Sequence, residues 1–365
     1  MYIKELKLKN FRNYSDFNIE FDKKVNLILG NNAQGKTNLL EAIYITSMGK
    51  SFRTNKENEM IMFEYDYSQI GIKAEKEYLD TNVEIVINKE SKKSIKKDGI
   101  QIKKISQLLE NILIVIFSPE DLKLVKDEPE KRRKFIDREL CQISPSYYEN
   151  LYNYKKVLYQ RNFYLKEREI DNSILDVWDS QLAKYGASII LKREEFIKKI
   201  SKISNEIQKS ITNNKEDLLI EYNPNIKTKE NKKAQEEYFY EKIKSSYEND
   251  IRLRTTTKGP HKDDIIFNVN GINIRSYGSQ GQQRTAALSL KLAELNLIKE
   301  ETGEEPILLL DDVMSELDIE RQEFLIKTLK ENQVFITTTD VDEKLKNSFP
   351  NAKIFFVEKG NIKTY

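Results

Sequence analysis

The stretch Val25-Asn-Leu-Ile-Leu-Gly30-Asn-Asn-Ala-Gln-Gly35-Lys36-Thr37 joins a short apolar run to a glycine-rich turn with the spacing G-x-x-x-x-G-K-T. A helical pattern begins directly afterwards at Asn38, so strand, loop and helix follow in the order that a phosphate-binding loop requires. Glycines let the backbone approach phosphate closely, and the loop amides and helix N-terminus direct donors towards an anion. The stretch therefore predicts an α/β fold that binds a nucleoside triphosphate.

Within this loop, Lys36 is expected to reach the β- and γ-phosphates and the Thr37 hydroxyl to ligate Mg²⁺. The cofactors implied are ATP and Mg²⁺. The residues expected to bind ATP are Gly30, Asn31, Asn32, Ala33, Gln34, Gly35, Lys36 and Thr37.

A second apolar run, Ile307-Leu-Leu-Leu310, ends in the carboxylates Asp311 and Asp312. This is the form of a Walker B strand, in which Asp311 holds Mg²⁺ directly or through water and Asp312 orients the attacking water. Two aspartates at a strand end are also common N-caps for the next helix. The phosphate-binding loop favours the first interpretation, so Lys36 and Asp312 are the expected catalytic residues, and Thr37 and Asp311 the expected metal ligands.

The turn Gly278-Ser279-Gln280-Gly281-Gln282-Gln283 precedes a strongly helical stretch, residues 284–300, and Ser315-Glu-Leu-Asp318 follows the second apolar run. Ser and Gly are ordinary N-cap residues, but such a turn can also bind an anion. The ordered set resembles the ABC-type ATPase heads, in which the signature loop of one subunit completes the ATP site of another. The resemblance implies that two chains build two sites, with these residues acting in trans: Ser279, Gln280, Gly281 and Gln282.

Length and composition limit the remaining possibilities. A chain of 365 residues exceeds one typical domain, and 39% hydrophobic residues suffice for a core beneath a surface rich in charge. The net charge of +2 predicts no partner by itself, and the single cysteine, Cys141, excludes an intramolecular disulfide. There is no signal-like N-terminus and no apolar run near membrane-spanning length, so we expect a cytoplasmic protein without a membrane partner.

The period of the hydrophobic pattern changes along the chain. Both ends alternate strand and helix patterns, whereas the middle shows helical spacing, as in Ile174, Trp178, Leu182, Tyr185 and Ile189. The pattern predicts α/β ends and a helical insertion between them. The resemblance to ABC-type heads implies a P-loop ATPase head, with a mixed sheet and an antiparallel lobe, over residues 1–125 and 255–365, and an inserted helical arm over 126–254. Residues 215–250 are expected to be irregular apart from a helix near 236–247.

Several further segments resemble the RecF family of bacterial recombination and repair proteins over essentially the whole chain. They are Asn10-Phe-Arg-Asn-Tyr14, Ser51-Phe-Arg-Thr54, Phe117-Ser-Pro-Glu-Asp-Leu122, Arg132-Arg133-Lys-Phe-Ile-Asp137, Trp178-Asp179, Gly259-Pro-His-Lys-Asp-Asp264 and Phe335-Ile-Thr-Thr-Thr-Asp340.

The resemblance implies a protein of recombinational repair and replication restart. Such a protein binds ATP, forms an ATP-dependent homodimer, hydrolyses ATP slowly with stimulation by DNA, and binds gapped, single-stranded, double-stranded or junction DNA. It acts with RecO and RecR to load the RecA recombinase. By motif match, Arg12 and Asn13 lie near the nucleotide, and Glu120 or Asp121 replaces the glutamine of transporter ATPases. The switch histidine of many ABC heads has no counterpart, because Thr337-Thr-Thr-Asp340 stands in its place.

Two other classes of protein fit the sequence less well. A transporter subunit is disfavoured by the large insertion, and an SMC-like tether by an insertion too short for a long coiled coil. The only histidine, His261, is either a structural residue on a tight turn or a phosphate contact. Two basic clusters, residues 89–104 and 131–138, are candidate DNA contacts or ordinary solvated faces.

Overall fold

The computed structural model describes residues 1–76, 79–109, 111–329, 331–339 and 347–364. The chain divides into two compact units, which we call the head unit (residues 1–122 and 294–365) and the arm unit (123–293). The expected division returned to the head at residue 255, whereas the compact arm unit extends to 293. The physical reason is strand pairing, because β10 (Asp264–Val269) pairs along its whole length with β9 (Leu218–Asn223) inside the arm.

The head unit contains two six-stranded sheets. In the mixed sheet the strand order is β15 (Asn361–Thr364), β14 (Lys353–Glu358), β3 (Val25–Leu29), β13 (Val334–Thr338), β12 (Ile307–Asp311) and β8 (Ile114–Phe117). In the antiparallel sheet the order is β2 (Tyr14–Glu20), β1 (Tyr2–Phe11), β4 (Tyr67–Glu75), β5 (Thr81–Asn88), β6 (Ser94–Lys97) and β7 (Ile100–Gln101). The predicted fold class, with a mixed sheet and an antiparallel lobe, is confirmed.

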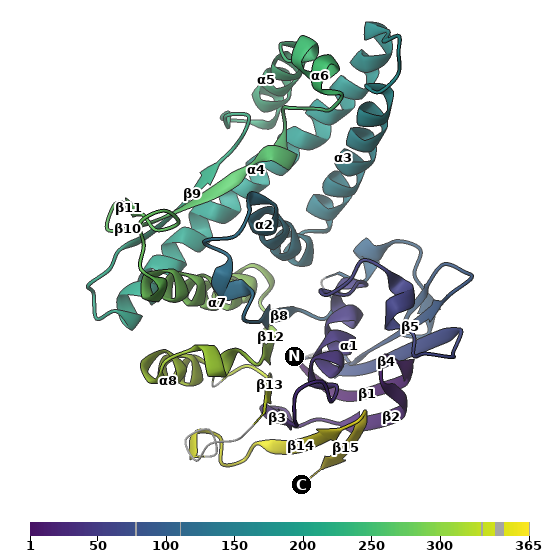
Figure 1. Cartoon of the computed structure of the whole chain (residues 1–365), viewed down its shortest axis with the longest axis vertical. Coiled ribbons are helices and arrows are strands. Elements are labelled where there is room, and N and C mark those ends of the chain that lie inside the picture. The colour runs from purple at the N-terminus through teal and green to yellow at the C-terminus, as the bar shows by residue number, and fades with distance from the viewer. Residues whose placement is uncertain (77–78, 110, 330, 340–346, 365) are drawn as a thin grey trace. The chain divides into compact units, whose positions relative to one another are not determined.

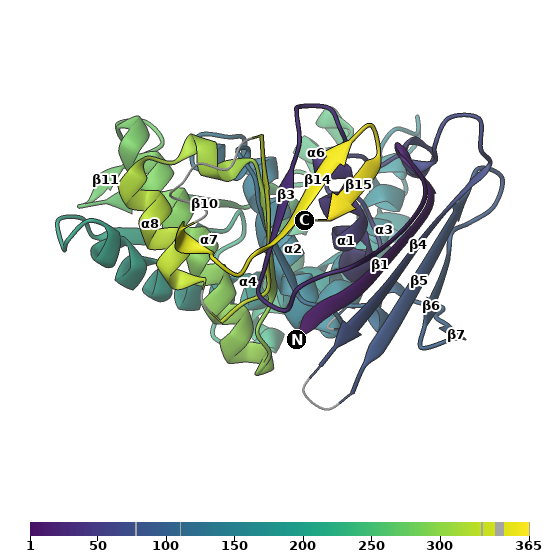
Figure 2. The same cartoon turned by 90° about the horizontal axis from the view of Figure 1, so that it is seen from below.

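Helix α1 (Lys36–Met48) lies between these two sheets (Figure 2). It is buried on nearly every side, which explains why its sequence shows no polar face. The neighbouring strands β8 and β12 are fully buried apolar runs, as parallel strands covered on both faces must be, whereas β5 alternates buried and partly exposed residues. Other helical elements in the described part of the head are η1 (Glu57–Met60), η2 (Ile105–Gln107), η5 (Val313–Glu316), α8 (Ile319–Thr328) and the end of α7 (Gln280–Thr302).

The arm unit is mainly helical, and its long helices α3 (Pro145–Tyr164) and α4 (Asn172–Ile211) pack side by side (Figure 1). A three-stranded sheet, β9, β10 and β11 (Ile272–Asn273), covers part of α4. The other elements are η3 (Asp121–Lys123), which crosses the boundary between the units, α2 (Pro129–Ile143), α5 (Lys232–Lys244), α6 (Tyr247–Leu253), η4 (Pro260–Lys262) and the start of α7 (Gln280–Thr302). Among the described residues, no helix is long and apolar enough to cross a membrane.

Two expectations about the arm were wrong in detail. Strand β9 lies in the stretch expected to be irregular, where no alternation strong enough to predict it was found. In α4 the buried face includes Leu175, Leu182 and Ile189, but Ile174 is 42% exposed. The helix is rotated from the expected stripe because Asp179 is buried in an ion pair that hydrophobic spacing does not reveal.

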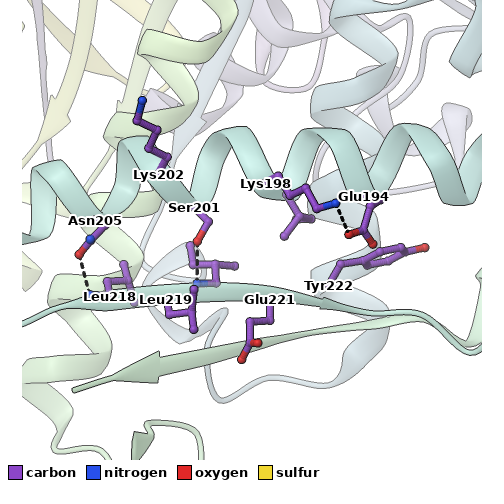
Figure 3. Close-up of a pocket in the computed structure, with 11 residues that line it drawn as sticks. Glu194, Lys198, Ser201, Lys202, Asn205, Leu218, Leu219, Glu221 and Tyr222 are labelled. Carbon is purple, nitrogen blue, oxygen red and sulfur yellow. Dashed lines mark hydrogen bonds and ion pairs between the residues drawn. The ribbon is translucent and has the colours of Figure 1, made fainter. Parts of the chain in front are cut away.

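A groove of about 450 Å³ runs between α4 and β9 (Figure 3). Strand β9 is the edge of its sheet, and its outward N–H groups are satisfied by α4: Leu218 N–H donates to Asn205 Oδ1 and Ile220 N–H to Ser201 Oγ, each at 2.9 Å. An unpaired edge invites pairing with another chain. The polar side chains of α4 therefore protect this edge, which accounts for the groove without a ligand.

Buried ion pairs join distant segments of the arm, and Asp137, Asp179 and Asp263 among them lie in the segments quoted for the family resemblance. Arg161 is fully buried, and its Nε donates to Asp179 at 2.7 Å while its Nη1 donates to Asp250 at 2.8 Å. Arg193, also buried, binds Asp137 at 2.7 Å and Asp263 at 2.8 Å. Removing one partner of such a buried pair typically costs about 3–5 kcal/mol. These ion pairs therefore fix the geometry of the arm.

Arg132 makes a further buried ion pair in the arm. Its guanidinium makes a bidentate pair with Asp264, at 2.6 and 2.9 Å, and it is 1% exposed. It also donates to the carbonyl of Asp127, so this part of the predicted basic cluster is internal to the protein. Burial raises the pKa of Asp263 and of Asp179, while the arginines beside them oppose that shift.

His261 is a structural residue that shares Thr256 as a hydrogen-bond partner with Arg161. Its Nε2–H donates to the Thr256 carbonyl at 2.9 Å, so Nδ1 accepts the Tyr154 hydroxyl at 2.7 Å. Burial lowers the pKa of His261 to about 4, with Lys262 and Arg133 acting in the same direction, and hydrogen bonding to Thr256 and the charge of Asp250 in the opposite one.

We predict that His261 makes the protein less stable as pH falls. The pKa of His261 lies near 4 when folded and near 6.5 when unfolded, so between these values the unfolded state binds more protons. The free energy of unfolding should therefore fall by about 3 kcal/mol from this group between about pH 7 and pH 4. Chemical denaturation across this range should show that His261→Gln has a flatter pH profile. Tyr154→Phe, which keeps the imidazole, should retain most of the slope; equal slopes for His261→Gln and the parent would contradict this assignment.

Candidate nucleotide-binding site

The glycine-rich loop leaves the carboxyl end of β3 and enters α1, as the sequence predicts. Lys36 is 4% exposed, and its Nζ donates to the carbonyls of Gly30 at 2.6 Å and Asn31 at 3.3 Å. This holds the ammonium across the mouth of the loop. Asn31, Asn32 and Ala33 are exposed at its rim. A cation, a helix N-terminus and exposed loop residues together form an anion site.

Two hairpins brace this loop from outside. From the β1–β2 turn, the Asn13 amide donates to Gln34 O at 2.8 Å and the Tyr14 hydroxyl donates to Gly35 O at 2.9 Å. From the β14–β15 turn, Lys359 N–H donates to Gln34 Oε1 at 2.7 Å and Gly360 N–H donates to Gln34 O at 3.2 Å. Gln34 is thus gripped from both sides, so the conformation of the loop is set by both ends of the chain.

The carboxyl ends of four parallel strands place the second predicted segment beside the loop. Leu310 pairs with Phe117 on β8 and Asp311 with Thr337 on β13, while Thr337 pairs with Ile28 on β3. The Thr37 hydroxyl consequently donates to Asp311 Oδ1 at 3.0 Å, across 274 residues of sequence. A hydroxyl and a carboxylate are ligands that Mg²⁺ accepts, so the pair fits the predicted metal site.

Thr337 is a residue of this site whose role the sequence did not predict. Its hydroxyl donates to Asp311 Oδ1 at 2.9 Å and accepts the backbone N–H of Asp312 at 2.9 Å. Burial raises the pKa of Asp311, and the hydrogen bonds from Thr337 and Thr37 partly oppose this shift. The sequence feature that could have identified Thr337 is its position in the strand beside Asp311, in the segment where transporter heads carry a histidine. Asp340, quoted with that motif, lies outside the described residues.

Asp312 adopts a left-handed backbone with φ of 51°. Its N–H is held by Thr337, and its carboxylate has no hydrogen-bond partner among the residues that the structure describes. The side chain directly follows Asp311 at the same sheet edge, which is a position from which a base can act. Its predicted catalytic role stays a prediction.

Arg12 and Asn13 lie beside the loop, but their side chains are engaged by protein. Arg12 makes a bidentate pair with Glu41, at 2.9 and 2.7 Å, and Glu41 is a fully buried carboxylate in α1 that also binds Arg53. The sequence did not predict a role for Glu41, although its partners Arg12 and Arg53 each lie in a segment that resembles the RecF family. Contact between Arg12 and nucleotide stays a prediction.

After β8, the turn at Ser118 separates the two carboxylates that the sequence left as alternatives. Asp121 accepts both the N–H and the hydroxyl of Ser118, at 2.8 and 2.9 Å, and so holds the turn closed. Glu120 is exposed and has no such bond among the described residues. Of the two, Glu120 is the one with a carboxylate available to a ligand.

The predicted signature turn forms a capping box at the start of α7. Ser279 N–H donates to Gln282 Oε1 at 3.0 Å, and Gln282 N–H donates to Ser279 Oγ at 3.1 Å. Ser279 and Gln280 are exposed, and Gly281 and Gln282 are half-buried. The turn thus presents the N-terminus of a 23-residue helix to solvent, where an anion would be stabilised.

Four lysines of the two basic clusters pair with carboxylates of the protein. Lys89 pairs with Asp66 and Lys93 with Glu57, while Lys131 pairs with Asp127 and Lys134 with Glu130. Charge in the sequence alone therefore identifies no DNA contact here.

The comparisons with known proteins agree with this geometry. The model of the family described as RecF/RecN/SMC N terminal domain matches residues 2–363. A DNA replication and repair protein RecF of Alkaliphilus oremlandii is 48% identical over 99% of this chain and all of the relative, and one of Clostridium tetani is 48% identical over 99% of both chains.

Solved structures agree as well. The recombination mediator protein RecF-ATPrS in the RecFOR pathway superposes with a TM-score of 0.93 at 37% identity, covering all of this chain and 98% of that one. The corresponding RecF-ATP structure gives a TM-score of 0.91 at the same identity, covering all of this chain and 97% of that one. An SMC head bound to ScpA, at 18% identity and a TM-score of 0.57, shares the fold.

We predict that Gly360→Ala weakens ATP binding. An added Cβ would lie 2.0 Å from the Asn13 carbonyl oxygen and force the β14–β15 turn away from Gln34. The expected loss of ATP affinity is about tenfold or more, measured by isothermal titration calorimetry.

Gly303→Ala is the matched control. Gly303 has a similar φ of 73°, against 76° for Gly360, and no neighbour within 4 Å, so it carries the same backbone strain without the collision. Equal ATP affinities of these two variants would show that the bracing hairpin does not shape the loop.

We also predict that Thr337→Val makes Mg²⁺-dependent nucleotide binding require a higher pH. Loss of the hydroxyl removes one of the two hydrogen bonds that lower the pKa of Asp311, so its carboxylate protonates more readily. Titrating Mg²⁺–ATP affinity against pH should show an upward shift for Thr337→Val and none for Thr337→Ser. If affinity depends on pH in the same way for the parent and both variants, Thr337 has no role in setting the pKa of Asp311.

Proposed function

Because this chain belongs to the RecF family, we propose that it is an ATP-dependent DNA-binding protein of recombinational repair and replication, switched by nucleotide between a monomer and a homodimer. The observation that carries the proposal is the meeting of Lys36, Thr37 and Asp311 at one sheet edge, 274 residues apart in sequence. Relatives that share the whole chain length are named for DNA replication and repair, and similar structures are named for bound ATP and an ATP analogue.

The head residues have separate tasks in binding ATP. Lys36 and the loop amides from Gly30 to Gly35 hold the phosphates, while Thr37 and Asp311 supply oxygens to Mg²⁺. Bound Mg²⁺ neutralises charge on the phosphates. The Thr37 hydroxyl donates a hydrogen bond to the Asp311 carboxylate, so the two proposed ligand oxygens lie close together. Their proximity supports this assignment. The protein site thus fits the nucleotide and its metal.

Hydrolysis is proposed to be slow and stimulated by DNA. Asp312 is the proposed base, held in direction by its backbone bond to Thr337. An aspartate is shorter than the glutamate that transporters carry here, so its carboxylate stands farther from an attacking water. Hydrolysis would then determine when the dimer releases its DNA or partners, and would not serve to turn over ATP rapidly.

Dimerisation is proposed to complete each site. The exposed N-terminus of α7, with Ser279 to Gln282, would meet the γ-phosphate on a second copy, which favours the paired state through differential affinity. ATP would therefore be required for pairing, and ADP would not support it.

The cellular setting completes the proposal. The proposed partners are gapped, single-stranded or duplex DNA and the RecO and RecR proteins. With them, in the cytoplasm, the protein would help to load the RecA recombinase. The functional division is proposed as a head over 1–125 and 255–365 and an arm over 126–254.

The test is a series of light-scattering and DNA-binding measurements without nucleotide, with ADP and with ATP. We predict pairing only with ATP, and stronger DNA binding in that state. Lys36→Met should abolish both effects of ATP, because the loop loses its buried cation. Ser279→Arg should bind ATP normally but stay monomeric, since a large side chain would block the turn.

Ser276→Arg, an exposed site three residues earlier, is the matched control and should pair normally. If Ser279→Arg pairs as well as Ser276→Arg, the turn does not complete a second site. If the parent protein pairs equally without nucleotide, with ADP and with ATP, nucleotide does not control dimerisation.

A further inference from the structure

We propose that the exposed face of α3 is a binding site for single-stranded nucleic acid, on which bases stack and beside which the backbone lies in a basic pocket. The inference rests on the proposed DNA-binding function and assigns it to a particular surface. We call this surface the α3 ring face. It consists of Tyr148, Tyr152, Tyr159 and Phe163, with Lys155 and Lys156 between them.

The ring face is a second aromatic face on a helix that already has a buried one. Tyr147, Leu151, Tyr154 and Val157 are buried on the side that packs against α4. On the opposite side Tyr152 is 60%, Tyr159 73% and Phe163 61% exposed. A soluble protein seldom presents so many rings in a row without a use for them.

Helical spacing aligns these rings into one strip. At about 100° per residue, Tyr148, Tyr152, Tyr159 and Phe163 lie within about 60° of each other, along about 22 Å of helix. The rings of Tyr148 and Tyr152 are nearly parallel, with centroids 6.5 Å apart and an angle of 19° between their planes. This is the one nearly parallel pair of the strip among the described residues, and Tyr148 in it is half-buried; aromatic rings along a line can serve as platforms for successive bases of a single strand.

A basic pocket adjoins the strip. A cavity of about 220 Å³ lies between α2, α3, α4 and the Pro260–His261 turn, and Lys155 belongs both to its lining and to the strip. Its other cations are Arg133, Lys134 and Arg193, and its carboxylates are Glu130 and Asp137. His261 is neutral near physiological pH, so cations outnumber carboxylates.

These cations are available to phosphate to different degrees. Arg193 is buried and bound to Asp137 and Asp263, so it sets the floor of the pocket. Lys134 pairs with Glu130 and Lys155 with Asp137, but both lysines are more than 60% exposed, and such surface pairs contribute little. Lys156 is exposed and has no ion-pair partner among the described residues. A phosphodiester chain can therefore recruit these lysines at low cost.

The chemistry favours a nucleic acid over a protein partner. Leu151 and Val157 of α3 are buried, and Leu158 is half-buried, so no fully exposed aliphatic side chain stands among the rings, whereas protein-docking helices present Leu, Ile or Val among their anchors. A second copy placed symmetrically would bring Lys155 and Lys156 towards their own counterparts. Glu149 borders the strip but lies about 100° around the helix from Tyr148. Rings with interleaved lysines match the faces of bases and the charge of phosphates.

The test uses the full-length protein with ATP and fluorescein-labelled oligo-dT, followed by anisotropy. Tyr152→Ala with Tyr159→Ala should weaken oligo-dT binding about 30-fold or more, because each stacked base is lost. Tyr152→Phe with Tyr159→Phe should bind as the parent does. Tyr152→Leu with Tyr159→Leu should be weak, because leucine keeps apolar area but cannot stack.

Lys155→Gln with Lys156→Gln should lower the dependence of affinity on salt, since fewer phosphates are neutralised. The control Tyr65→Ala, at a 43% exposed tyrosine in the head unit, should bind normally. All variants should keep the parent melting temperature, ATP affinity and ATP-dependent pairing.

The outcomes separate this inference from the proposed function. If the parent binds no oligo-dT with ATP, the ring-face inference fails, and the proposed function fails as well only if the parent also binds no duplex or gapped DNA. If the parent binds and pairs but the double alanine variant binds equally well, the ring face is not the site. If the leucine variant binds as tightly as the tyrosine protein, the surface is an apolar docking face, and the stacking inference is overturned.

Discussion

The head depends on the register of four parallel strands, β3, β13, β12 and β8. Because Asp311 is paired with Thr337 and Thr337 with Ile28, the carboxyl ends of these strands meet at one edge. A shift of one residue in β12 would turn Asp311 away from Thr37 and leave a buried carboxylate without its donors. The 3.0 Å hydrogen bond from Thr37 to Asp311 thus reports the correct register of the whole sheet. The chemistry and the fold are specified by the same constraint.

The arm is specified by a different interaction, the buried pairing of arginines with aspartates. Arg161 and Arg193 each bind two carboxylates that come from distant segments. Buried ion pairs add little net stability compared with apolar packing, but they tolerate few alternative arrangements, since an unpaired charge is costly. Their benefit here is a defined geometry for helices that hydrophobic spacing alone leaves free to rotate.

Local signals in the sequence were sufficient for the fold class and for the residues at the strand ends. The loop around Lys36 and the run ending at Asp311 are contiguous, and strand, turn and helix propensities act on contiguous residues. What could not be predicted depends on contacts between distant segments. Glu41 lies inside a helix and becomes important only because Arg12 and Arg53 fold onto it. Strand β9 pairs with a segment some 45 residues away, so its own residues carry little of the signal.

The brace on the glycine-rich loop shows why a motif is not yet a site. The spacing from Gly30 to Thr37 indicates that the backbone can wrap around phosphate. It does not predict which conformation the loop adopts before phosphate binds. That is set by Asn13 near one end of the chain and by Gly360 near the other, both through Gln34. A loop held in place before binding loses less entropy when it closes on its ligand. Both chain ends therefore shape the loop that is proposed to bind ATP.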